Sequence, residues 1–159
     1  MSVQYRKGAA GALLDEYEKA ITALKECIRD IREEDWTKIV DPVTADDNCR
    51  SLQSIMTHVV SSAYSYATYI GQWKGLPVER PERKYHSNAT AYSNDIEAAF
   101  RFTEKVFEEI RDEDMEQFDT SRKILTGWGQ VYDVEQMMEH AIVHILRHRR
   151  QIEKLKKLC

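Results

Sequence analysis

Residues 133–155, DVEQMMEHAIVHILRHRRQIEKL, predict an amphipathic helix whose first residue is marked in the sequence. Asp133 and Gln136 form an Asp-x-x-Gln capping box, a pattern in which each side chain bonds a backbone N–H at the helix start. Apolar residues then recur at intervals of three and four, which places them on one face of a helix. The inward positions are Met137, Met138, Ala141, His144, Ile145, His148, Ile152 and Leu155.

Three histidines in this helix need an explanation. His140, His144 and His148 follow one another at intervals of four, so their imidazoles lie about 40° apart on one helical face. A histidine on an apolar stripe is costly without a polar partner. Two imidazoles at this spacing are close enough to bind one metal ion. The spacing alone leaves open whether the pair is His140 with His144 or His144 with His148.

Three further segments have helical periodicity. We expect helices over residues 11–33, from Ser51 as N-cap to Lys74, and over residues 89–110, with Ser87 or Asn88 as cap. Residues 111–132 are polar and irregular, and we expect a short strand or hairpin there. Four helices of about twenty residues, each with one apolar face, predict an all-α four-helix bundle with an irregular segment before the last helix.

Length and composition exclude several classes of protein. A chain of 159 residues with 42% hydrophobic and 31% charged residues is typical of one soluble, helix-rich domain, which we expect to span residues 1–159. The formal charge of -4 does not attract nucleic acid or an anionic membrane. No apolar run approaches the roughly 20 residues that span a bilayer. Cys27, Cys49 and Cys159 lack paired spacing, which favours free thiols and a cytoplasmic location.

A further imidazole comes from the second predicted helix. His58 lies among apolar residues of that helix, with small side chains beside it that would leave room for a pocket. A lone interior histidine is more often hydrogen-bonded within the core than bound to metal. Ligands from two helices of a bundle can converge, however, and a histidine pair on another inward stripe favours a metal site. His86, in a loop beside Lys84 and Tyr85, is expected to be solvated.

These residues resemble a known family. A bundle with His58 in its second helix and His-x-x-x-His-Arg-x-Gln at residues 144–151 is similar to the DinB/YfiT-like superfamily of metal-dependent enzymes, which is unrelated to the translesion polymerase of the same name. The resemblance covers the helix order of nearly the whole chain. It implies His58, His144 and His148 as the metal ligands, with His140 a neighbour or a substitute. Arg150 stands where the family usually has glycine.

The resemblance also implies a function. Its members bind a divalent metal ion, most often zinc or nickel, and the characterised ones include S-transferases and isomerases that use a low-molecular-weight thiol. We therefore expect a metal-dependent transferase or hydrolase that acts on small electrophilic molecules, in a homodimer. Whether the protein is catalytic stays open, because the sequence does not identify a residue as the general acid or base of a reaction. The alternative is a non-catalytic metal- or ligand-binding stress-response protein.

Other residues are candidates for supporting roles. The N–H groups of the metal-binding imidazoles are expected to hydrogen-bond to neighbouring residues, for which the candidates are Glu139, Gln151, Ser62 and Tyr132. Aromatic residues that could line a pocket, although such residues are more often core, are Tyr64, Tyr66, Trp73 and Trp128. Cys27 and Cys49 are weak candidates for a nucleophile. The basic residues near the C-terminus predict a solvated helix face or a dimer contact rather than a nucleic-acid site. They are Arg147, Arg149, Arg150, Lys154, Lys156 and Lys157.

Overall fold

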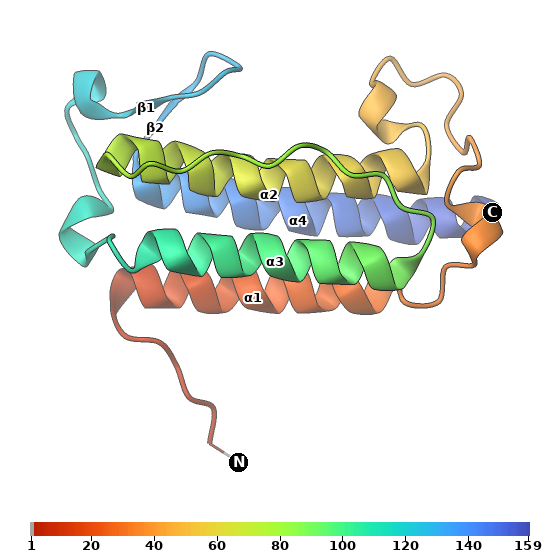
Figure 1. Cartoon of the computed structure of the whole chain (residues 1–159), viewed down its shortest axis with the longest axis horizontal. Helices are drawn as coiled ribbons and strands as arrows, with labels where there is room; N and C mark the ends of the chain where they lie inside the picture. The colour runs from red at the N-terminus through yellow and green to blue at the C-terminus, as the bar shows by residue number, and fades with distance from the viewer. Residues whose placement is uncertain (1) are drawn as a thin grey trace.

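Four long helices lie alongside one another in the computed structural model, which describes residues 2–159 (Figure 1). They are α1 (Gly8–Ile28), α2 (Leu52–Lys74), α3 (Ala89–Phe107) and α4 (Val134–Leu155). Strands β1 (Ile124–Leu125) and β2 (Val131–Tyr132) form an antiparallel hairpin before α4. Short 3-10 turns occupy Glu33–Asp35, Asp47–Cys49, Asp112–Asp114, Thr120–Arg122 and Lys156–Leu158. The predicted all-α bundle is confirmed, and so is the hairpin in the irregular segment.

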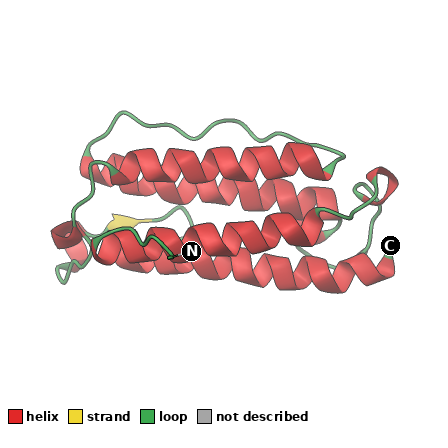
Figure 2. Ribbon diagram, turned by 90° about the horizontal axis from the view of Figure 1, so that it is seen from below, coloured by secondary structure: helices red, strands yellow, loops and turns green. Residues whose placement is uncertain are grey.

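The order of the helices around the bundle determines which side chains can meet. Each of α1 and α2 packs against both α3 and α4. In Figure 1, α1 and α4 run in one direction, and α2 and α3 run in the other. The connection from α2 to α3, residues 75–88, therefore returns along the length of the bundle, as Figure 2 shows. Fourteen extended residues reach about 46 Å, ample for a 19-residue helix that is about 29 Å long.

The helix starts follow the local sequence. Ser51 caps α2 in a reciprocal capping box with Ser54, and Asp133 does the same for α4 with Gln136. Asn88, not Ser87, caps α3 by accepting a hydrogen bond from the backbone N–H of Ala91. The start of α2 is thus fixed about two turns before His58, and the start of α4 is fixed well before its histidine pair.

Two helices end earlier than predicted. The chain leaves α1 at Ile28 rather than at residue 33, and a 3-10 turn then carries Trp36 into the core, where its ring lies 5.0 Å from that of Tyr92. Trp36 is fully buried. Similarly, α3 ends at Phe107, although Ile110 stays buried after the helix has ended. Burial of a large side chain thus overrides the helical pattern at both ends.

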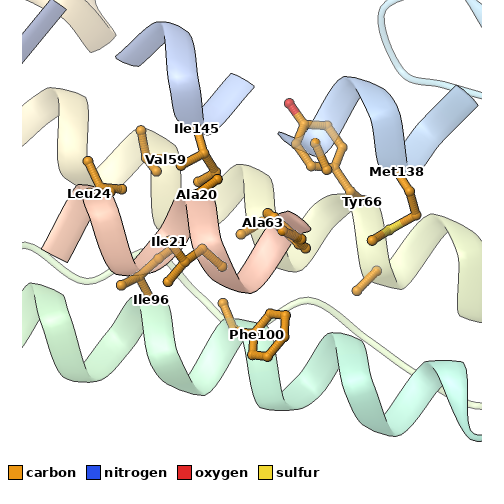
Figure 3. Packing of buried hydrophobic residues seen from close by; sticks show 14 of the residues in the cluster. Ala20, Ile21, Leu24, Val59, Ala63, Tyr66, Ile96, Phe100, Met138 and Ile145 are labelled. Carbon is orange, nitrogen blue, oxygen red and sulfur yellow. The ribbon is translucent and has the colours of Figure 1, made fainter. Parts of the chain in front are cut away.

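The core lies between the four helices along the whole bundle. Figure 3 shows side chains of all four helices meeting there, among them Ile21 of α1, Ala63 of α2, Phe100 of α3 and Ile145 of α4. Within residues 2–159, no helix is both long and apolar enough to cross a membrane.

Candidate metal centre

Three histidines meet where α2 faces α4. His58 comes from the second turn of α2, and His144 and His148 come from successive turns of α4. One ring nitrogen from each of the three lies within 4.8 Å of the others. His144 and His148 are both 5% exposed, and His58 is half-buried. The structure thus brings together the three residues that the family resemblance implies as ligands.

The ring nitrogens fit a shared cation. Nε2 of His58 lies 3.1 Å from Nε2 of His144. Two imidazole nitrogens bound to one ion at about 2.0–2.1 Å would lie roughly 2.9–3.4 Å apart. Nε2 of His148 is buried and has no hydrogen-bond partner among the described residues. A buried nitrogen without a partner is costly, and an ion would satisfy it together with the other two. The donor set therefore fits a divalent metal ion.

All three imidazoles are held in the neutral form that a metal ion requires. Burial lowers the pKa of His144 to about 2, and its three neighbouring histidines and Arg147 lower it further. Burial likewise lowers the pKa of His58 to about 4, with a contribution from His148. The pKa of His148 is also lowered by burial, although its hydrogen bond with Gln151 acts in the opposite direction. Protons therefore do not compete with a metal ion for these nitrogens at neutral pH.

Gln151 fixes the orientation of one imidazole. Nδ1 of His148 lies 2.8 Å from Oε1 of Gln151, one turn further along α4. An amide oxygen only accepts, so Nδ1 carries the proton and Nε2 keeps its lone pair for a ligand. Nδ1 of His58 and Nδ1 of His144 are buried without a partner among the described residues. Within residues 2–159, Gln151 is thus the one of the four predicted hydrogen-bonding residues that bonds an imidazole of this group.

A loop closes one side of the centre. Cys49, in the turn before α2, directs its thiol to Oε1 of Gln151 at 4.0 Å and to Oδ2 of Asp46 at 3.5 Å. Burial raises the pKa of the Cys49 thiol, so it stays protonated at neutral pH. Cys27 lies apart from the centre, on the α1 side of α4, where its thiol faces the carbonyl oxygen of Arg149 at 3.9 Å. Neither thiol is a ready nucleophile here.

Aromatic rings form the other side. The ring of Tyr66 lies 5.6 Å from that of His144 and 5.3 Å from that of His140. His140 stacks on Trp128 of the β1–β2 turn at 5.6 Å. Burial raises the pKa of Tyr66 to about 12, so its hydroxyl remains a hydrogen-bond donor at neutral pH. His140 thus belongs to this aromatic wall, whereas the group of three within 4.8 Å consists of the other histidines.

The remaining candidates lie away from the centre or contact it indirectly. Glu139 is exposed, and the hydroxyl of Tyr132 lies 3.5 Å from Nδ1 of His140. Trp73 donates to the carbonyl of Arg122 from a half-buried position. The other residues named from sequence are Ser62, whose hydroxyl lowers the pKa of Tyr66 against the effect of burial, and Tyr64, which packs on Phe102.

One prediction about a histidine was wrong. His86 is half-buried rather than solvated, because Nε2 of its ring lies 2.6 Å from Oδ2 of Asp95 and its ring packs on Tyr92. The loop sequence around His86 is polar and gave no sign of these contacts, which depend on the path of residues 75–88 along α3.

Comparisons with known proteins agree with this arrangement. The model of the DinB family matches residues 1–157. The chain belongs to the DinB family. The fold is also similar to that in the crystal structure of a conserved protein from Enterococcus faecalis, with a TM-score of 0.64 at 11% identity, over 96% of this chain and 98% of that protein's chain. No curated protein matches the sequence.

Two parts of this centre were not predicted from the sequence. The turn containing Asp46 and Cys49 lies beside the histidines, but loop residues carry no periodicity that would have placed it there. Arg147 was grouped with the basic tail, although it follows His144 by three positions and therefore shares its face of α4. That spacing was the available signal.

Proposed function

We propose that this chain binds one divalent metal ion, zinc or nickel, through His58, His144 and His148. The observation that carries the proposal is the convergence of three neutral imidazole nitrogens from two helices, one of them buried and without a partner. Burial of three histidines on an otherwise apolar seam has no benefit to packing, whereas a bound ion would stabilise all three. Membership of the DinB family is consistent with this role.

The chain is further proposed to be a metal-dependent enzyme that acts on small electrophilic molecules, as a thiol-cofactor S-transferase or a hydrolase. A divalent ion held by three neutral imidazoles supplies a strong Lewis acid, which promotes ionisation of water or of a thiol near neutral pH. Around it, Tyr66 offers a protonated hydroxyl and Gln151 holds His148 in one tautomer.

The surroundings favour thiol transfer over hydrolysis. Among residues 2–159, the group of potential ligands contains histidines alone, and Asp46, the carboxylate of the covering loop that contacts Cys49, is exposed. Water is a far weaker acid than a thiol, so for hydrolysis the metal ion must lower the pKa of the attacking group much further. A thiol with a pKa of about 8.5 ionises with less assistance, so a centre without a buried carboxylate suits it better.

Two further properties belong to the proposal. A homodimer is supported by the exposure of Val143 (58%) and Leu146 (40%) on the outer face of α4, where a second copy would cover them. Sedimentation of the purified protein at micromolar concentration tests this. A cytoplasmic location is supported by three free cysteines.

An activity screen tests the enzymatic proposal. Zinc- and nickel-loaded protein is assayed for conjugation of a bimane electrophile with several low-molecular-weight thiols, and for hydrolysis of aryl esters. Thiol conjugation above the uncatalysed rate, lost in His144→Ala and kept in His86→Ala, supports the S-transferase. Ester hydrolysis with the same pattern supports the hydrolase instead. Stoichiometric metal with neither activity favours the non-catalytic metal-binding role.

A further inference from the structure

One hydroxyl group of α2 is buried without a hydrogen-bond partner. Ser61 is 5% exposed, and its Oγ atom has no partner among residues 2–159. A serine or threonine inside a helix can satisfy its hydroxyl by donating to the carbonyl oxygen four residues earlier. Ser65 does so to the carbonyl of Ser61 at 2.9 Å, and Thr68 does so at 2.8 Å. The hydroxyl of Ser61 forms no such bond, so its partner must lie off the helix.

Ser61 lines a small cavity between α2, α3 and the segment that returns along the bundle. The cavity measures about 50 Å³, and its wall includes Thr57, Ser61 and Tyr64 of α2, Asp95 of α3 and residues 81–84 of the returning segment. One molecule in liquid water occupies about 30 Å³, whereas sites for organic ligands measure about 300–1,000 Å³. The cavity therefore has room for a water molecule but not for an organic ligand.

The returning segment covers the polar side chains of α2 beneath it (Figure 1). Residues 81–85 are exposed, whereas Thr57 and Ser61 are 2% and 5% exposed. Within residues 2–159, residues 79–87 form no hydrogen bond from backbone to backbone. The segment is thus attached to the bundle through side chains of the helices it crosses.

Those attachments stop one turn before Ser61. Gln53 donates to the carbonyl oxygen of His86 at 3.0 Å, and Thr57 donates to that of Lys84 at 3.2 Å. Ser61 follows Thr57 by four residues and therefore lies on the same face of α2. Its hydroxyl faces the same segment but has no bond to it. One bridging molecule in the cavity would supply the missing attachment.

We propose that this cavity binds one water molecule, which hydrogen-bonds Oγ of Ser61 and joins α2 to the returning segment. The hydroxyl of Ser61 donates to the water oxygen, and the water donates to oxygen atoms of the wall, among them a backbone carbonyl of residues 81–84. A buried water typically forms about three hydrogen bonds, and cavities that stay dry are lined by apolar groups. The wall of this cavity carries three hydroxyl groups and a carboxylate.

The water would also support a contact beside the histidine centre. Arg83, in the cavity wall, donates to Oδ1 of Asn48 at 3.0 Å. Asn48 belongs to the turn Asp47–Cys49, in which the thiol of Cys49 faces Gln151. None of the residues that line the cavity is a proposed metal ligand, so the water site and the metal site can be tested separately.

Two measurements detect the water. A high-resolution crystal structure locates it, and relaxation dispersion of the solvent nuclei counts slowly exchanging internal waters in solution. Both are applied to wild type and to Ser61→Val, which removes the hydroxyl and fills the space with methyl groups. The control is Ser62→Ala, which alters the adjacent serine of α2 that does not line the cavity.

Wild type and Ser62→Ala should each show one water within about 3.2 Å of Oγ of Ser61. Ser61→Val should lack it and should contain one slowly exchanging water fewer. The proposal would be overturned by a wild-type structure without that water, with Oγ of Ser61 bonded to the carbonyl of Thr57, or with a cation in the cavity. Equal counts for wild type and Ser61→Val would overturn it as well. If Ser61→Val does not fold, the wild-type structure alone decides.

The attachment of the segment has its own readout. The backbone N–H of His86 donates to the hydroxyl of Tyr92 at 3.1 Å, so its hydrogen exchange reports opening of the segment. Ser61→Ala should speed this exchange about fivefold, as expected for the loss of one hydrogen bond, and Ser62→Ala should leave it unchanged. Equal exchange in wild type and Ser61→Ala would show that the water does not hold the segment.

Discussion

Nε2 of His58 and Nε2 of His144 lie 3.1 Å apart, although 86 positions separate the two residues in the chain. The contact depends on the antiparallel packing of α2 against α4, which sets one turn of each helix opposite the other. Two neutral imidazoles can share a proton at this distance, but a third buried nitrogen from His148 then has no partner. A cation between them would satisfy all three nitrogens.

Gln151→Leu should weaken metal binding without unfolding the protein. The variant removes the oxygen that accepts from Nδ1 of His148, so the imidazole loses its fixed tautomer. Loss of such an outer contact typically lowers metal affinity about 10–100-fold. Competition against a chromophoric chelator measures the affinity, with the exposed neighbour substituted in Arg150→Gln as control. Equal affinities of Gln151→Leu and wild type would refute the role of this glutamine.

The metal-free protein should lose stability as the pH falls from 7 to 5. Unfolded histidine has a pKa of about 6.5, whereas the pKa of His144 in the folded protein is lowered to about 2. The unfolded state therefore binds more protons in this interval, and the free energy of unfolding decreases with decreasing pH. The expected loss for one such histidine is about 2 kcal/mol.

Urea unfolding at the two pH values checks this, with His144→Gln as the matched variant. Because carboxylates titrate in both proteins, the informative quantity is the difference between them. Wild type should lose more stability than His144→Gln on acidification. A loss of the same size in both would show that His144 is protonated normally in the folded protein.

Gly71→Ala should destabilise the fold by about 1–2 kcal/mol, although alanine is the better helix former by about 1 kcal/mol. A methyl group at this position of α2 would overlap the side chain of Val78 in the segment that returns along the bundle. Urea denaturation measures the effect. The double variant Gly71→Ala with Val78→Ala should recover most of the loss, since it removes the overlap. A single variant more stable than wild type would contradict the packing.

The parts of the structure that depend on local sequence were predictable. Ser51 and Asp133 cap their helices by accepting a hydrogen bond from the backbone N–H three residues further on. The spacing of four residues places His140, His144 and His148 on one face of one helix, and the choice of His144 with His148 came from the family resemblance. His58 was identified as their partner from its apolar surroundings and from the family resemblance. Tertiary packing determines which turn of α2 faces which turn of α4. The distances between the histidine nitrogens could therefore be obtained only from the structure.

The parts that depend on distant contacts were not predictable. The end of α1 is set by the burial of Trp36 against Tyr92, and the position of Cys49 beside Gln151 is set by the path of a loop. His86 was expected to be solvated because its neighbours in sequence are polar, yet its partner Asp95 lies nine residues away on α3. In each case the contacting residue belongs to another segment of the chain, so the periodicity of the local sequence carries no information about it.

The metal content of the purified protein tests the central claim most directly. The chain is produced without a histidine tag, dialysed against zinc or nickel and then against buffer, and analysed by elemental mass spectrometry. We predict one ion per chain in wild type, His140→Ala and His86→Ala, and less than about one tenth of that in His58→Ala, His144→Ala and His148→Ala. Wild type without metal, or the same metal content in all six proteins, would contradict the account.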